Sequence, residues 1–391
     1  MSALAVKKNI FIVKVRAHFN QSVYVAMNIS GMLKQTLHFY QDFYNRTDLK
    51  QAIFKLIEEL KDSFSDIIRK CTNLAQTNFD LGLFHYTSCN LSDAILRFRM
   101  AMFFEPAHYI EANYYLGRCY YEQYKYDKAA DYIQKYIDSG DKAKSAEAAF
   151  LLSVINGKTS EIKNIPKSII QAKANQVASV YIKHFKDHKQ SPMVPEQEQQ
   201  FTLLNQYLLD SSKPTGNNVL DIGCAFGTMG RLCRIHNIAT MLTGVDIAEK
   251  MVDIAAKLTE NLAVHEHIVV YHKTQAIDIY QYFLEFLQLN IPKFDLLLAF
   301  DFITCNSDLE NLFIGTSTIS KDDAILALTF KSSKGEAVEF NDKLEQFSYT
   351  PEFVISNASK SSWKLAQEYD ISFIGAEQGK LMIFCKNLKM A

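Results

Sequence analysis

The spacing of apolar residues separates a helical first half of the chain from a second half in which strands and helices alternate. From about residue 48 onward, apolar side chains such as Leu49, Ile53 and Leu56 recur at the three- to four-residue spacing of an amphipathic helix. Short apolar runs at 219–222 and 294–300 then alternate with helical segments. This order predicts an all-α region followed by an α/β domain.

Two segments of the helical half match each other at an offset of 35 residues. Small residues at matched positions let two packed helices approach closely, and a proline such as Pro106 ends a helix. The pattern therefore predicts successive helical hairpins. The matched pairs are Leu81 with Leu116, Gly82 with Gly117, Tyr86 with Tyr121, Ala94 with Ala129, and Phe98 with Ile133.

The first of these segments resembles a tetratricopeptide repeat, a unit of about 34 residues with small and apolar residues at fixed positions. The second repeat is degenerate, because Tyr136 and Asp141 replace the usual alanine and proline. The resemblance covers roughly residues 72–156 and implies a concave surface that binds a protein or peptide. A purely intramolecular, scaffolding use of the helices is the alternative. The residues that match the repeat are Leu81, Gly82, Ala94, Phe98, Ala101 and Pro106.

The alternation in the second half predicts a mainly parallel sheet with helices on both faces. A closing antiparallel hairpin at its edge gives a Rossmann-like, seven-stranded arrangement. We expect strands at 218–222, 240–247, 267–272, 294–301 and 324–330, and the hairpin at 369–375 and 381–386.

The turn after the first of these strands is the part of the sequence most indicative of function. Asp221 closes the strand, and Gly223 and Gly227 allow a tight turn and a ligand close to the backbone. The helix that follows, from about Thr228, directs its N-terminal amides at the same place. The next strand also ends in an acid, Asp246, which is suitably placed for ribose hydroxyls. These features predict a nucleotide-like ligand.

An acid followed by this glycine pattern, and then a strand that ends in an acid, resembles the S-adenosylmethionine-binding half of class I methyltransferases. The resemblance covers roughly residues 174–391, and the middle glycine of the pattern is Ala225. It implies S-adenosyl-L-methionine as cofactor, no metal ion, and a place for Asp301 beside the transferred methyl group or the substrate. The cofactor-binding residues that it implies are Asp221, Gly223, Cys224, Ala225, Gly227, Asp246, Ile247, Gln275 and Phe300.

Each of these acids also has an ordinary structural explanation. Asp221 could cap the turn, Asp246 could cap the next helix, and Asp301 could cap the helix after the fourth strand. The family often has an acid near the adenine amine after the third strand. The nearest residue here is Gln275, with Asp278 beyond it.

Composition restricts the partners and the compartment. The net charge is -1 and there is no basic stripe, so we expect no nucleic-acid partner. An Asn/Asp-Pro-Pro-Tyr motif is absent after the fourth strand, which argues against methylation of a base amino group. No apolar run approaches the roughly 18 residues of a membrane span. The 7 cysteines form no C-x-x-C pair, which favours a reducing, cytoplasmic location without a zinc site.

We expect four segments: an N-terminal segment at 1–47, helical repeats at 48–156, a linker at 157–173 and a methyltransferase domain at 174–391. Residues 1–41 contain no acid, so the first segment is either a targeting leader or an ordinary N-terminus. The combination also resembles a group of predicted bacterial repeat-containing methyltransferases. Three functions follow: methylation of a protein docked on the repeats, methylation of a small molecule with the repeats used for assembly, or protein binding without catalysis.

Overall fold

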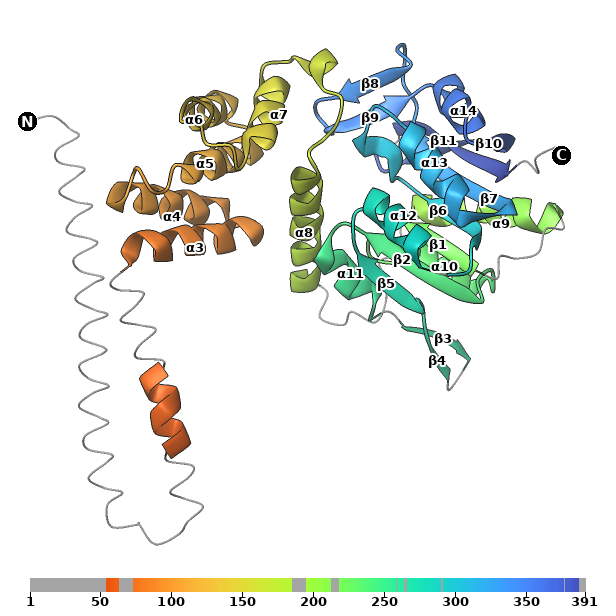
Figure 1. The fold of residues 1–391 in the computed structure, drawn as a ribbon, viewed down its shortest axis with the longest axis horizontal. Coiled ribbons are helices and arrows are strands. Elements are labelled where there is room, and N and C mark those ends of the chain that lie inside the picture. Colours follow the sequence, from red (N-terminus) through yellow and green to blue (C-terminus); the bar gives the residue numbers. More distant parts are fainter. Residues whose placement is uncertain are drawn as a thin grey trace, which may run out of the picture. The chain divides into compact units, whose positions relative to one another are not determined.

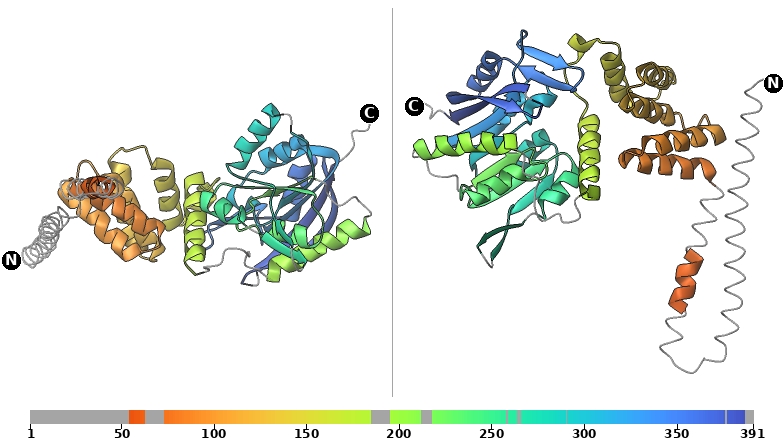
Figure 2. Two further views of the ribbon diagram at one scale, coloured as in Figure 1. Left: turned by 90° about the horizontal axis from the view of Figure 1, so that it is seen from below. Right: turned by 180° about the vertical axis from the view of Figure 1, so that it is seen from behind.

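The computed structural model describes residues 54–62, 73–184, 195–211, 218–257, 259–263, 266–289, 291–375 and 377–386. The chain divides into two units, Met1–Asn73 and Leu74–Ala391. The described part of the first unit is a helix at 54–62, and the predicted segment 1–47 lies outside the described residues. The second unit contains the helical repeats and the sheet, labelled in Figure 1 and drawn from two further sides in Figure 2.

The second unit begins with helical hairpins, as predicted. One hairpin consists of α3 (Leu74–Thr87) and α4 (Leu91–Phe104), the next of α5 (Glu111–Glu122) and α6 (Tyr126–Asp138), and α7 (Ser145–Ile155) follows. Within the described residues, no helix is both long and apolar enough to cross a membrane.

The two hairpins repeat one packing contact. A methyl group added to Gly82 would lie 2.6 Å from the Phe98 ring, and one added to Gly117 would lie 2.5 Å from the Ile133 side chain. Phe98 and Ile133 are both fully buried. The absence of a side chain at each glycine therefore lets the two helices of a hairpin pack closely.

The sheet has seven strands in the order β10-β11-β7-β6-β1-β2-β5, which confirms the predicted fold class. Strand β1 pairs in parallel with β2 and β6, β2 with β5, and β6 with β7. The closing pair is antiparallel: β11 pairs with both β7 and β10. The strands are β1 (Asn218–Ile222), β2 (Met241–Asp246), β5 (Lys273–Ala276), β6 (Phe294–Ala299), β7 (Ser320–Lys331), β10 (Trp363–Phe373) and β11 (Glu377–Lys386).

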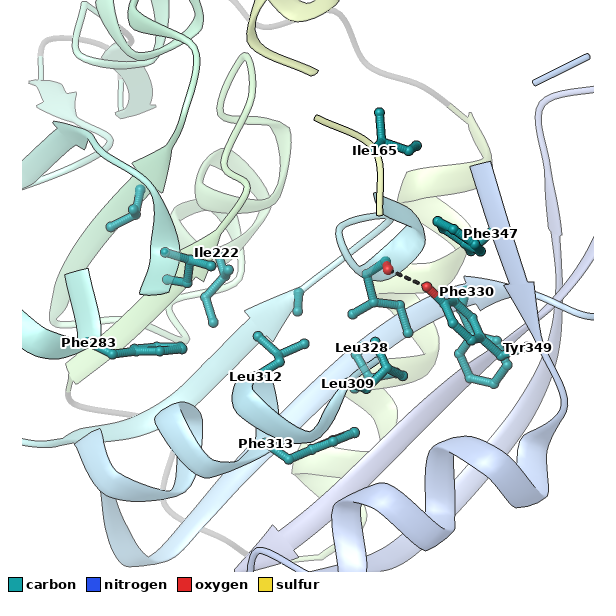
Figure 3. Packing of buried hydrophobic residues seen from close by; sticks show 14 of the residues in the cluster. Ile165, Ile222, Phe283, Leu309, Leu312, Phe313, Leu328, Phe330, Phe347 and Tyr349 are labelled. Atoms are coloured by element: carbon teal, nitrogen blue, oxygen red, sulfur yellow. Dashed lines mark hydrogen bonds between the residues drawn. The ribbon is translucent and has the colours of Figure 1, made fainter. Parts of the chain in front are cut away.

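Successive residues of the central strands enter two different hydrophobic clusters, because side chains alternate between the faces of a sheet. In β11, Leu381 and Ile383 belong to one cluster, and Met382 and Phe384 to the other. The cluster of Figure 3 includes side chains from α12 (Ile279–Gln288), α13 (Glu310–Ile319) and α14 (Pro351–Ser359). The opposite cluster includes α9 (Pro195–Asp210), α10 (Thr228–Ile235) and Ala255 of α11 (Glu249–Ala255).

The predicted third strand was wrong. Its residues fall partly in β4 (Glu266–Val269), which pairs with β3 (Thr259–Ala263) in a separate two-stranded sheet. The third strand of the main sheet is β5, at its edge. Val270 and Tyr271 supplied much of the apolar signal, and they are buried in the cluster that contains α9 and α10.

The closing hairpin is longer than predicted, because β10 begins at Trp363 and residues 377–379 belong to β11 rather than to the turn. A second hairpin, of β8 (Val338–Asn341) and β9 (Gln346–Tyr349), was not predicted at all. Its strands are only four residues long.

Helix α8 (Lys167–His184) joins the repeats to the sheet. Between β8 and β9, the carboxylate of Glu345 accepts a hydrogen bond from the Tyr121 hydroxyl of α5 at 2.6 Å and forms an ion pair with Lys173 of α8. Phe150 of α7 also contacts Phe340 of β8, edge to face. The repeats and the α/β domain therefore share one core.

We predict that Gly117→Ala destabilises the second unit. Overpacking against Ile133 costs about 1–3 kcal/mol, whereas alanine in a helix is favoured over glycine by about 1 kcal/mol. We expect a net loss of about 1 kcal/mol in urea unfolding. Gly335→Ala is the control, since a methyl group there meets nothing within 4 Å. A stabilised Gly117→Ala protein would contradict the close-packing explanation.

Candidate functional site

A cavity of about 290 Å³ lies at the carboxyl ends of β1, β2, β5 and β6. These four strands are parallel neighbours, so the residues at their carboxyl ends meet at one edge of the sheet. Each of the four contributes an acid to the cavity lining, from within the strand or just beyond it. The acids are Asp221, Asp246, Asp278 and Asp301.

The turn after β1 has three residues in the left-handed region. The φ angles are 71° at Gly223, 44° at Ala225 and 84° at Gly227. A methyl group on Gly223 would also lie 2.6 Å from the Phe302 ring, so glycine is required there for two reasons. Ala225 adopts a conformation that costs a residue with a Cβ about 1 kcal/mol.

The carboxylate of Asp246 holds this turn in place. Its Oδ2 accepts a hydrogen bond from the amide of Ala225 at 3.1 Å, and its Oδ1 accepts one from the amide of Ala248 at 2.8 Å. Burial raises the pKa of Asp246, and the hydrogen bonds from the amides of residues 248, 225 and 247 oppose the shift. A carboxylate has about four acceptor positions, so Asp246 can also accept from a ligand.

Asp221 lies at the base of the cavity and is 1% exposed. The Tyr271 hydroxyl donates to its Oδ2 at 2.6 Å, and the Gly230 amide also donates to the carboxylate. Methyl groups at Gly230 and Gly244 would lie 2.3 Å and 2.7 Å from Tyr271, so these two glycines make room for the ring. Asp221 thus fixes Tyr271 and the start of α10 against the turn.

Burial raises the pKa of Asp221 to about 7. The Tyr271 hydrogen bond opposes this shift, and the nearby charge of Asp246 adds to it. Asp221 therefore titrates near neutral pH.

The lining of the cavity beyond β2 and β5 is mainly apolar, with the carboxyl group of Asp278 and the hydroxyl of Tyr280 as polar groups. Ile247, Ile277 and Ile279 line it together with Asp278. Asp278 accepts from the first amides of α12 and forms an ion pair with Lys167 of α8, with 2.9 Å between Nζ and Oδ1.

Most of the predicted cofactor residues line this cavity. The exceptions are Gln275, whose side-chain amide donates to Glu285 of α12 at 3.3 Å, and Gly227, whose amide closes the turn on the Cys224 carbonyl at 2.7 Å. Asp278, which lies beyond Gln275 in the sequence, does line the cavity. The predicted residues that do line the cavity are Asp221, Gly223, Cys224, Ala225, Asp246, Ile247, Phe300 and Asp301.

The segment that was predicted to be a linker covers part of the cavity. Ile165, Lys167 and Ile170 belong to the lining. The Ile165 amide donates to the Cys305 carbonyl at 3.1 Å, which ties this segment to the loop after β6. The Tyr349 hydroxyl, at the dashed line in Figure 3, donates to the Ile303 carbonyl of the same loop at 2.6 Å.

Asp301 follows β6 in a strained conformation, with a φ of 53°. Its amide donates to the Thr329 hydroxyl of β7 at 2.8 Å. Its side chain is open to the cavity, but the protein packed around the site displaces bulk water and raises its pKa to about 6. The Lys331 ammonium opposes this shift, and Glu377 adds to it. A carboxylate with such a pKa is ionised at neutral pH and can accept a proton.

Other reactive groups are sparse around the cavity. Among the described residues, no group of three or more His, Cys, Asp or Glu could hold a metal ion. Cys224 and Cys305 line the cavity as free thiols, and burial raises the pKa of both. Thiols of this kind are poor nucleophiles.

We predict that Asp221→Asn changes how stability depends on pH. The folded-state pKa of about 7 lies above the unfolded value of about 3.9, so wild-type folding takes up a proton between these values. The stabilisation from this group is complete below about pH 4 and is lost as the pH rises through 7. Asparagine resembles the protonated acid, so the variant should not lose this stabilisation. From pH 5 to pH 7.5 we expect its free energy of unfolding in urea to rise by at least about 1 kcal/mol relative to that of wild type.

Asp323→Asn, at an exposed acid of β7, is the control and should follow the wild-type curve. Parallel pH curves for Asp221→Asn and wild type would show that Asp221 takes up no proton on folding.

No protein-family model and no curated protein matches the chain. Among solved structures, the chain is similar to magnesium protoporphyrin IX methyltransferase (ChlM) from Synechocystis with bound SAM, at 16% identity and a TM-score of 0.40, over 56% of this chain and 97% of that one. The N-methyltransferase NodS from Bradyrhizobium japonicum, in complex with S-adenosyl-L-homocysteine, gives 18% identity and a TM-score of 0.36, over 49% and 87%. None of these similarities says which reaction this chain performs. The strand order and the antiparallel closing pair are those of the class I methyltransferase fold, which the sheet-containing C-terminal part of the second unit adopts.

Proposed function

We propose that the chain is an S-adenosylmethionine-dependent methyltransferase. The observation that supports this most strongly is the set of four acids around one cavity at the ends of adjacent parallel strands, against a single lysine in the lining, Lys167, which is paired with Asp278. A dinucleotide would bring a negatively charged pyrophosphate into this acidic environment, which opposes binding. S-adenosylmethionine instead brings two cations, a sulfonium and an ammonium group, against one carboxylate, so its net charge is positive.

The cavity lining offers a partner for each part of this cofactor. Asp246 would accept from the ribose hydroxyls, and Ile247 and Ile277 would pack on the adenine. Asp278, rather than Gln275, would accept from the adenine amine. The turn at 223–227 would lie along the methionine part. Asp221 would support it through its hydrogen bonds from Tyr271 and the Gly230 amide. A volume of about 290 Å³ is close to the roughly 300 Å³ lower limit for small-molecule sites.

The bound cofactor would supply an electrophilic methyl group on sulfur. The protein's contribution is to align the acceptor atom with that methyl group and to exclude water. Ile165 and Ile170 shield the cavity from one side. Asp301 would accept a proton from an acceptor that is protonated at rest.

A second candidate is methylation of a protein that docks on the repeats. This proposal uses the tetratricopeptide resemblance of α3–α6, and it is supported by large apolar side chains exposed there: Phe84 is 64% exposed, Phe103 49% and Tyr124 81%. A labelled methyl group, followed through a lysate that is separated into macromolecular and small-molecule fractions, decides between a protein acceptor and a small-molecule acceptor. Label in protein favours docking on the repeats, and label confined to the small-molecule fraction excludes it.

We predict that Asp246→Ala weakens S-adenosylmethionine binding at least about tenfold, because charge-assisted hydrogen bonds to the ribose are lost. Isothermal titration calorimetry of the intact chain measures this, with circular dichroism as the check on folding. Asp308→Ala is the control, because that carboxylate also accepts from a backbone amide, that of Glu310 at the start of α13 at 2.9 Å, but does not line the cavity. Equal affinities of both variants and wild type would rule out the ribose assignment.

A further inference from the structure

A second cavity, of about 220 Å³, adjoins the first. Asp301 and Gln197 line both cavities, so Asp301 stands where the two meet. The second cavity has the volume of about seven water molecules at roughly 30 Å³ each. It is large enough for a small molecule or a side chain. Its lining is completed by Glu196, Gln200, Lys331, Phe373 and Ile374.

The charges in this lining favour a cation. Glu196 and Asp301 contribute carboxylates, and Lys331 is the cation among the lining residues. The Lys331 ammonium is already paired, at 2.6 Å from Glu377 Oε2 and 2.7 Å from Gln346 Oε1. Glu377 and Gln346 therefore compensate much of its charge, and although Lys331 also acts on Asp301, the two carboxylates outnumber the one lysine in the lining. An anionic acceptor would be repelled by them.

The position of Asp301 supports the same conclusion. Its left-handed conformation and the hydrogen bond from its amide to Thr329 fix the residue at the junction of the cavities. Strained backbone of this kind persists where the surrounding structure enforces it, often at functional sites. Phe373 is 7% exposed and gives the same cavity an apolar surface for the body of the acceptor.

We propose that the second cavity binds the methyl acceptor and that this acceptor is a small amine, held as an ammonium by Glu196 and Asp301. The inference rests on the proposed function, because the first cavity must supply the methyl donor. Asp301 takes the proton that the ammonium must lose before its lone pair can attack. The nitrogen then forms a bond to the methyl carbon, the carbon–sulfur bond breaks, and its electron pair remains on sulfur.

The test is a titration of the intact chain, saturated with S-adenosylhomocysteine, with pairs of probes that share a carbon skeleton. The pairs are phenethylamine with phenylacetate, cyclohexylamine with cyclohexanecarboxylate, and butylamine with butyrate. We expect each amine that binds to bind at least about tenfold more tightly than its acid. Amines that bind no more tightly than the acids, or that do not bind, overturn the inference.

Variants locate the binding. Glu196→Gln should weaken the amines about fivefold, as for a partly screened ion pair, and Glu198→Gln on the same helix should not, because Glu198 does not line the cavity. Wild-type affinity for the amines should fall below about pH 6, as Asp301 becomes protonated, and Asp301→Asn should remove this fall. Equal effects of Glu196→Gln and Glu198→Gln would place the amine elsewhere.

Titration of S-adenosylhomocysteine alone separates the two levels of the proposal. If it does not bind, the proposed function fails and the acceptor assignment fails with it. If it binds while the acids bind as well as the amines, the proposed function stands and only the acceptor assignment is wrong.

Discussion

The carboxylate of Asp246 is the constraint on which the site depends. It accepts from the amides of Ala225 and Ala248, and so connects the turn after β1 to the loop before α11. Because Ala225 is left-handed, the turn needs such a partner to offset the strain. The same carboxylate lines the cavity, so one group both holds the turn and presents acceptor oxygens to a ligand.

The repeats affect this site through α8. The first turns of α8 supply Lys167 and Ile170 to the cavity lining, and Lys173, further along, pairs with Glu345. Glu345 is 7% exposed and also binds Tyr121 of the repeats. A buried carboxylate that lost either partner would be costly, so the repeats, α8 and the β8–β9 turn hold one another in place.

Most of the fold could be predicted from the sequence, because the buried central strands are recognisable as apolar runs. Strands buried on both faces, such as β6 and residues 324–330 of β7, are nearly continuous apolar runs. Edge strand β5 reads Lys-Thr-Gln-Ala and has no such signal, so it was misplaced, and the acid just beyond it, Asp278, was ranked behind Gln275. The bond between Tyr271 and Asp221 joins residues 50 positions apart, and no local pattern indicates it.

We infer that the acidic cavity selects a cationic nucleoside cofactor over a dinucleotide. Calorimetric titration of the intact chain with S-adenosylmethionine and, separately, with NAD⁺ under the same conditions tests it most directly. We expect saturable one-to-one binding of S-adenosylmethionine and no measurable binding of NAD⁺. Binding of NAD⁺ with equal or greater affinity would contradict it.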